Sequence, residues 1–401
     1  MHTLRPIAVV AAFVCSAAAQ TVWSMGAPWT DLAAVVGAAA PGDIVLLNGM
    51  TFPPFALNKG LTFVGPGVIR PPVSSSGTTA LVIPTTQRAH FLDVDFLPAA
   101  VFDWYTHAVT ANGVVTFEDC TFGAGVPYSL AVAGTILLER CTFTPATFLN
   151  PQTQSAGMQV LGGVCWIANS TLVGGPGHFN SGGNPYVIPP TTALRVEAGT
   201  VVIASSTMTG GDGYVDSIFG TPEAGAPALV LVGGDVTLAD CMLVGGSSPA
   251  SLPGATALDA GGGAVSRART TFLGGAGTPA GPPTTGTVTL VPGLVGLAMP
   301  QPFRLGLSAQ LIATAGSSQL LGMVAAVDSA AATQTGVSGP FLAAPQLIPV
   351  LVAAPLAGGQ VVRTINVPNQ AALLGAALFA QAFQFDGTIL RVSPVVGGTV
   401  Y

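Results

Sequence analysis

Two polar segments near the middle of the chain carry residue types that bind sugars or cations. Aromatic rings offer flat apolar faces, and the carboxylates and amides beside them offer hydrogen bonds. Carboxylates without rings would suit calcium. The simpler alternative is that the rings cover nearby backbone and the polar groups face water. The candidate residues are His178, Asn180, Asn184 and Tyr186 in the first segment, and Asp212, Tyr214, Asp216 and Glu223 in the second.

A second candidate patch lies in residues 102–107, where Trp104 and Tyr105 are adjacent in a chain with 4 Trp and 5 Tyr. They would form an exposed stacking platform in a loop, or else pack beneath the N-terminal part of the fold. Close by, Asp93 and Asp95 are two residues apart, which would place both carboxylates on one strand face as an acid/base pair. The alternative is that one lies at a bend and the other faces solvent.

Motifs of common hydrolases and nucleotide-binding enzymes are missing from the sequence. It contains no GxSxG, HExxH or Walker loop, and no CxxC pair or Cys/His cluster that would indicate zinc. Residues 210–216 look like a single calcium-binding nonapeptide, but the acidic residue falls one position late. We therefore predict no cofactor, with calcium as a weak alternative, and favour a non-catalytic protein.

The charge of the chain argues against nucleic acid as a partner, and its hydropathy argues against a membrane-spanning helix. The 401 residues carry a net charge of −6 and one lysine, Lys59, so there is no basic face for nucleic acid. After the N-terminus every apolar run is interrupted before about 18 residues, so no membrane-spanning helix is expected. Residues 1–19 are typical of a Sec-type signal peptide that ends in three alanines before Gln20. We expect the mature protein to be secreted or held at the cell surface.

An internal repeat explains how these segments are positioned. Aligned on Cys120, the pattern returns at Cys141, Ser170, Ser206, Cys241 and Thr270, with a weaker copy at Val94. Glycine stands seven residues before the reference position in six copies, and in those six a polar residue stands directly before it. Two residues after it stands a large apolar side chain: Phe96, Phe122, Phe143, Leu172, Met208, Leu243 or Phe272.

The pattern predicts a coil of short strands. Apolar residues alternate with period two, so one face points inward. The polar residue before the reference position suits a tight bend, because Asn and Asp tolerate the left-handed backbone region. One coil cannot bury its apolar face alone, so successive coils stack with parallel strands and share one core. Because the two polar segments leave consecutive coils at the same corner, we expect them to be neighbours.

Repeats such as "VTFEDCTF" resemble those of right-handed parallel β-helix proteins of the pectin-lyase-like superfamily, over roughly residues 30–290. The start of the chain is similar too, with Thr30 or Asp31 capping a short apolar helix that would plug the first coil. If the resemblance extended to activity, a hydrolase of that superfamily would carry an adjacent pair of aspartates and a Gly-His-Gly motif. A calcium-dependent lyase would carry several carboxylates for the metal and an Arg or Lys as the base. This chain has no Asp-Asp pair, and Gly177-His178-Phe179 lacks the second glycine.

Beyond residue 290 the repeat stops. Residues 291–401 form short apolar segments separated by turns, which predicts a β-sandwich. Residues 371–383 have helical propensity, but their neighbours favour a strand. Residues 367–387 resemble a C-terminal module of many secreted proteins of environmental bacteria; the matching residues are Pro368, Asn369, Leu374, Gly375, Phe379, Gln381, Phe385 and Asp386.

Taken together, the sequence predicts an all-β protein: a signal peptide (1–19), an N-terminal cap (20–42), a right-handed parallel β-helix (43–290) and a small C-terminal β-sandwich (291–401). We expect a non-catalytic binding or structural role outside the cell, in contact with polysaccharide or cell-envelope components. The alternative is a polysaccharide lyase or glycoside hydrolase with an atypical site. Cys120 and Cys141 occupy the same inward slot on consecutive coils, and we expect both to be free thiols.

Overall fold

The computed structural model describes the chain from residue 20 onward, apart from several short segments. The described residues are 20–28, 30–70, 77–97, 105–123, 128–132, 134–144, 156–180, 186–215, 221–291, 294–315, 320–326, 330–332, 337–338, 340–343, 348–355, 359–370, 377–385 and 390–400. The signal-peptide prediction therefore lies outside the described residues.

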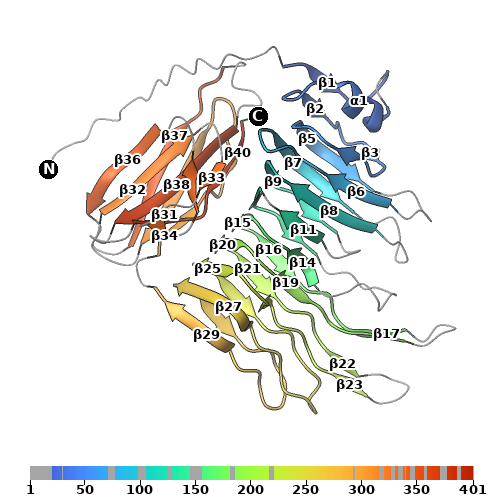
Figure 1. Cartoon of the computed structure of the whole chain (residues 1–401), viewed down its shortest axis with the longest axis vertical. Helices are drawn as coiled ribbons and strands as arrows, with labels where there is room; N and C mark the ends of the chain where they lie inside the picture. Colours follow the sequence, from blue (N-terminus) through green and yellow to red (C-terminus); the bar gives the residue numbers. More distant parts are fainter. Residues whose placement is uncertain are drawn as a thin grey trace.

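The chain winds into a coil whose strands form three faces, and every strand pair along these faces is parallel (Figure 1). The first face is preceded by β1 (Val22–Ser24) and holds β2 (Ile44–Leu46), β5 (Thr62–Ile69), β7 (Arg88–Phe96), β9 (Val114–Glu118), β12 (Thr135–Glu139), β15 (Val164–Ala168), β20 (Thr200–Ala204), β25 (Asp235–Ala239), β27 (Leu258–Ala268) and β29 (Thr284–Leu290). The second face holds β3 (Thr51–Phe52), β10 (Thr121–Phe122), β13 (Thr142–Phe143), β16 (Thr171–Val173), β21 (Thr207–Thr209), β26 (Met242–Val244) and β28 (Thr271–Leu273). The third holds β4 (Ala56–Leu57), β6 (Gly77–Leu81), β8 (Tyr105–Ala111), β11 (Tyr128–Val132), β14 (Ala156–Val160), β19 (Thr192–Val196) and β24 (Leu229–Leu231).

The predicted bends between the first and second faces are confirmed. In all seven copies the residue before the reference position has a left-handed backbone, with φ between 47° and 57°. Such a conformation is uncommon outside glycine, and Asn and Asp adopt it most readily. The residues are Asp93, Asp119, Arg140, Asn169, Ser205, Asp240 and Arg269.

The predicted inward ladder is also confirmed. Phe96, Phe122, Phe143, Leu172, Met208, Leu243 and Phe272 pair in register from one coil to the next. The Phe122 and Phe143 rings stack with their centroids 4.3 Å apart and an angle of 10° between planes. Cys120 and Cys141 are buried free thiols, each within reach of backbone carbonyls on its own coil and the previous one. A shared apolar core therefore runs from coil to coil, as the repeat requires.

A short helix closes the N-terminal end of the coil. Helix α1 (Leu32–Ala38) begins after Asp31, whose carboxylate accepts hydrogen bonds from the N–H groups of Ala33 (2.9 Å) and Ala34 (3.2 Å). Its side chains Leu32, Val35 and Val36 are buried in the core of the coil. The helix thus covers apolar side chains that the first coil would leave exposed.

The C-terminal residues form small, mainly antiparallel sheets. One contains β30 (Gly296–Ala298), β31 (Ser308–Ala315) and β37 (Gly359–Asn366); the other contains β34 (Val337–Ser338), β39 (Leu390–Val392), β38 (Ala377–Phe385), β32 (Leu320–Ala326) and β36 (Ile348–Pro355), with β40 (Val396–Thr399) beside β38. Strands β33 (Ala330–Ala332) and β35 (Phe341–Ala343) form a separate pair. Side chains from both sheets share one core, so this part is a sandwich. The predicted fold class is confirmed, and residues 377–385 form a strand, as expected.

Candidate functional site

The two polar segments of the sequence form hairpins that project from the coil. Strand β17 (His178–Asn180) pairs with β18 (Tyr186–Ile188), and β22 (Tyr214–Val215) pairs with β23 (Pro222–Glu223), both antiparallel. In Figure 1 they extend to the lower right, on the side of the coil away from the sandwich. Asn184 and Asp216 lie outside the described residues. The structure therefore places His178, Asn180 and Tyr186 on one hairpin, and Tyr214 and Glu223 on the other.

The bases of the two hairpins lie side by side, as expected from their shared corner. The N–H of Gly177 donates to the carbonyl of Asp212 (2.8 Å). A Cβ on Gly177 would lie 2.8 Å from Cδ1 of Tyr214, so these segments touch. The Asp212 carboxylate accepts a hydrogen bond from the N–H of Ser247 on the next coil (2.7 Å). Asp212 thus helps to hold the base of the second hairpin.

The second predicted patch is only partly a loop. Tyr105 begins β8, which pairs in parallel with β6 and β11 on the third face of the coil. The loop assignment was wrong for this residue because the repeat alignment did not include a third strand in each coil. Trp104 lies outside the described residues. Asp93 occupies a bend with φ 55°, so it does not share a strand face with Asp95. The position of Asp93 agrees with the alternative interpretation, in which one of the two aspartates lies at a bend.

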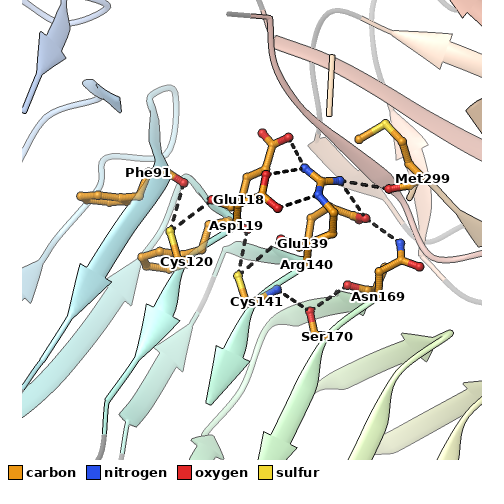
Figure 2. A network of polar contacts seen from close by, with 12 residues as sticks. Phe91, Glu118, Asp119, Cys120, Glu139, Arg140, Cys141, Asn169, Ser170 and Met299 are labelled. Carbon is orange, nitrogen blue, oxygen red and sulfur yellow. Dashed lines mark hydrogen bonds and ion pairs between the residues drawn. The ribbon is translucent and has the colours of Figure 1, made fainter. Parts of the chain in front are cut away.

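A buried polar cluster that the sequence analysis did not single out lies between the first face of the coil and the sandwich (Figure 2). At its centre Arg140 forms ion pairs with Glu118, with Asp119 (2.8 Å) and with Glu139 (3.3 Å). The Glu118 and Glu139 side chains are 0% exposed. Arg140 also donates from Nη1 to the carbonyl of Met299 in the sandwich (3.0 Å). We call this contact region between coil and sandwich the joint.

Neighbouring side chains complete the polar cluster. Asn169 donates from Nδ2 to Oε1 of Glu139 (2.6 Å), and Nε2 of His90 lies 3.3 Å from Oε2 of Glu118. Oε2 of Glu139 has no hydrogen-bond partner among the described residues. Gly398 of β40 lies against the Glu118 carboxylate, and any side chain at this position would overlap it. The absence of a Cβ thus lets the sandwich approach the glutamate.

Burial and charge shift the titration of this cluster. Burial raises the pKa of Glu139 to about 8, although Arg140 and Asn169 act in the opposite direction. Burial lowers the pKa of Arg140, but its bond to Asp119 and the charges of Glu139 and Glu118 outweigh this and raise it above its ordinary value. The arginine therefore stays charged, while burial favours the protonated form of Glu139 against the pull of Arg140.

A second arginine repeats the contact at the far end of the joint. Arg269 occupies the same bend position as Arg140 and binds Asp240 of the preceding coil through Nε (2.6 Å) and Nη2 (2.9 Å). Its Nη1 donates to the carbonyl of Leu294 (3.0 Å), and Oδ2 of Asp240 accepts from Thr314 (2.6 Å). Each arginine thus pairs with an aspartate one coil earlier and with a carbonyl near or in the sandwich.

Between the two arginines the joint is apolar. Leu137, Trp166 and Val202 point outward from three consecutive coils and are buried against Ala326, Phe379 and Val395 of the sandwich. The guanidinium of Arg88 lies 5.1 Å from the centroid of the Phe379 ring. A solvated coil face would carry polar residues at these outward positions. The apolar stretch therefore marks the area that the sandwich covers.

A signal for the joint is present in the repeat, at positions that point away from the core. Four residues before the reference position the coils carry His90, Thr116, Leu137, Trp166, Val202, Thr237 and Ser266. Only the three central coils are apolar there. Two residues before it, the coils carry Leu92, Glu118, Glu139 and then Ala168, Ala204, Ala239 and Ala268, all buried. Small or apolar outward residues in adjacent coils predict a covered face.

The chemistry available in the described residues is limited. The carboxylates of Glu118 and Glu139 are fully buried and paired with Arg140, so a polymeric substrate cannot reach them. No group of three or more His, Cys, Asp or Glu side chains in the described part of the chain has the arrangement of a metal site. No helix in that part is long and apolar enough to span a membrane.

Comparisons with known proteins give little further information. No protein-family model matches the sequence, and no curated protein is significantly similar to it. Among solved structures, the tailspike protein 4 enzymatically active domain of bacteriophage CBA120 has a TM-score of 0.30 and 11% identity, over 89% of this chain and 64% of that one. A superoxide reductase (neelaredoxin) from Ignicoccus hospitalis has a TM-score of 0.18 and 11% identity, over 27% and 80%. These similarities are too distant to bear on activity.

Proposed function

We propose that this protein is an exported, non-catalytic β-helix scaffold that contacts polysaccharide or another cell-envelope polymer through its two hairpins. The observation that carries the proposal is the division of polar groups between the two sides of the coil. On the sandwich side the carboxylates of Glu118 and Glu139 are buried in the joint, whereas the hairpins extend from the other side. The carboxylates in the joint therefore hold the protein together rather than act on a substrate.

The arrangement of the hairpins supports a binding role. Their bases touch through Gly177, Asp212 and Tyr214, so the two hairpins start as one unit. Their sequences combine histidine, asparagine, tyrosine and carboxylates, which can stack on sugar rings and bond to hydroxyls. An extended polymer could then lie along both hairpins, and a coil that shares one continuous core would hold them in a fixed relation.

The proposal is tested with the mature chain, residues 20–401, on a panel of immobilised acidic and neutral glycans. We expect binding without depolymerisation, and replacing Tyr186 and Tyr214 by alanine should weaken binding by about tenfold. The control Leu161→Ala changes an exposed side chain outside the hairpins and should leave binding unchanged. Equal binding by the tyrosine variant and the parent would remove the hairpins from the contact.

The same samples test the alternative, a polysaccharide lyase or glycoside hydrolase. If the parent shortened any glycan, and the double variant Asp212→Asn with Asp216→Asn lost that activity while keeping its thermal stability, the chain would be an enzyme. Depolymerisation that survives in the double variant would exclude these two carboxylates from the mechanism.

A further inference from the structure

The last coil ends in an open strand edge. Strand β29 pairs with β27, and no other strand among the described residues pairs with it. The N–H of Val291 donates to the carbonyl of Arg267 (2.8 Å). Because backbone groups alternate in direction along a strand, the N–H and C=O groups of Val288 and Leu290 point to the open side. In Figure 1 this edge lies at the end of the coil opposite α1.

The edge lacks the features that usually prevent strand pairing. Edge strands are commonly protected by charged side chains, proline or a covering element. Strand β29 has the sequence TTGTVTL, and no charged residue occurs between Arg269 and Arg304. Leu290 and Leu273 of the neighbouring β28 are 59% and 47% exposed. The opposite end of the coil, by contrast, is covered by α1.

The apolar core reaches this end through Val265, Phe272 and Val288, but a charged side chain interrupts the inward ladder beside them. Arg267 takes the place in the inward ladder that Leu238 holds one coil earlier. Its guanidinium donates to the carbonyl of Thr270 (3.1 Å) and lies 5.3 Å from the centroid of the Phe272 ring. A partner that needed to extend the core would meet a charge here. What the end offers instead is a row of backbone donors and acceptors, and these fit an extended strand.

We propose that β29 is a dimer interface, at which two copies of this chain meet end to end with their β29 strands antiparallel. A two-fold axis would pass through Thr287. It would pair residues 284–286 of each copy with residues 288–290 of the other copy, so that the strand pairs on both sides of its bend. This places Thr285 opposite Thr289, and Thr–Thr pairs are favourable in antiparallel sheets. The strand is uncharged along its length, so no like charges face each other.

A second copy fits this edge for two reasons. Two-fold pairing gives each β29 strand the same partner and closes the assembly, so neither copy keeps a free β29 edge. The sandwich lies on the flank of the coil and does not cover this end (Figure 1). The paired strands bury a small area, so we expect a weak dimer that forms in the micromolar range or above. This inference is independent of the hairpins and of their ligand.

The test is sedimentation velocity of residues 20–401 at concentrations up to about 1 mM, a range that detects weak association. We expect a monomer–dimer equilibrium in the parent. Thr287→Lys brings two lysines together at the axis and should raise the dimer dissociation constant at least about tenfold. The control Val232→Lys adds the same charge at an exposed position on an inner coil and should leave the constant unchanged.

A second variant tests the backbone pairing itself. Leu290→Pro removes an N–H that points to the open edge, and proline is tolerated at such positions. It should weaken the dimer, whereas Leu290→Thr, which keeps the N–H, should weaken it less. A parent that stays monomeric at every concentration would overturn the proposal. So would a dimer that persists unchanged in both Thr287→Lys and Leu290→Pro.

Discussion

The two arginines of the joint offer a matched comparison of buried and exposed ion pairs. Arg140 and Arg269 occupy the same bend position, with φ of 52° and 47°, and each binds an aspartate of the preceding coil and a backbone carbonyl. Replacing either by methionine leaves the backbone strain of the bend unchanged, because methionine, like arginine, has a Cβ with no branch. Any difference between the two variants therefore reports the surroundings of the guanidinium.

Those surroundings differ in burial. Arg140 is 11% exposed and pairs with two carboxylates that are 0% exposed, in addition to Asp119. Arg269 is 31% exposed, and its one carboxylate partner among the described residues is Asp240 at 21%. Removing one partner of a buried pair leaves an uncompensated charge, which costs about 3–5 kcal/mol. An exposed pair contributes about 0–1 kcal/mol. We expect Arg140→Met to destabilise the protein several kcal/mol more than Arg269→Met.

The assay is urea denaturation of both variants, combined with hydrogen exchange of β38, which packs on the joint. Arg140→Met should speed exchange in β38 and lose stability most at alkaline pH, because the buried Glu139, whose pKa is raised to about 8, then ionises without a counter-charge. Adding Glu118→Gln and Glu139→Gln to Arg140→Met should restore most of the loss. Equal destabilisation by Arg140→Met and Arg269→Met, or no rescue by the two glutamines, would refute this account of the joint.

Three further predictions concern the joint and the core of the coil. The pKa of Glu139 is about 8 in the fold against 4.5 as its ordinary value, so the fold favours the protonated form and loses stability as pH rises from 4.5 to 8. Glu139→Gln should therefore flatten the pH dependence of the melting temperature and be the more stable form at pH 9, and a profile identical to the parent would contradict this. Phe122→Asp places an unpaired charge in the phenylalanine ladder and should cost several kcal/mol in denaturation; parent-like stability would show that the register is wrong. Residues 20–401 should show four reactive thiols after denaturation without reductant, but few in the native state, since burial raises the pKa of Cys241 to about 12 and also raises those of Cys120 and Cys165; two thiols after denaturation would indicate a bonded pair.

Inward positions of the coil could be predicted from the sequence because each coil repeats the same physical demand. A left-handed bend favours a polar residue before Cys120 and its equivalents, and the shared core selects Phe, Leu or Met two residues after them. These demands recur seven times, so the pattern stands out from a single sequence. The third strand of each coil was missed because its length and spacing vary more, which is why Tyr105 was assigned to a loop.

The joint could not be predicted in the same way, because it depends on contacts between distant segments. Glu118 and Arg140 look like solvent-facing residues of a repeat, and nothing nearby in the sequence indicates Gly398 or Met299 as their partners. In the sequence, the position of the joint is indicated only by comparing the outward residues of successive coils. Trp166, between Leu137 and Val202, is the strongest signal. Three adjacent apolar side chains, one of them a large ring, would form a costly exposed patch if water covered this face.

The outward positions of such a coil are where its individual function must lie. Inward residues are constrained by stacking on the neighbouring coils, so they carry no information about a partner. Departures from a polar outward face are then informative: an apolar column with two bend arginines marks the docked sandwich, long insertions mark the hairpins, and an uncharged terminal strand marks the open end. Each departure has its own physical cause, and each can be removed by substitutions that leave the inward ladder intact. The coil thus allows docking, ligand binding and self-association to be tested separately in one protein.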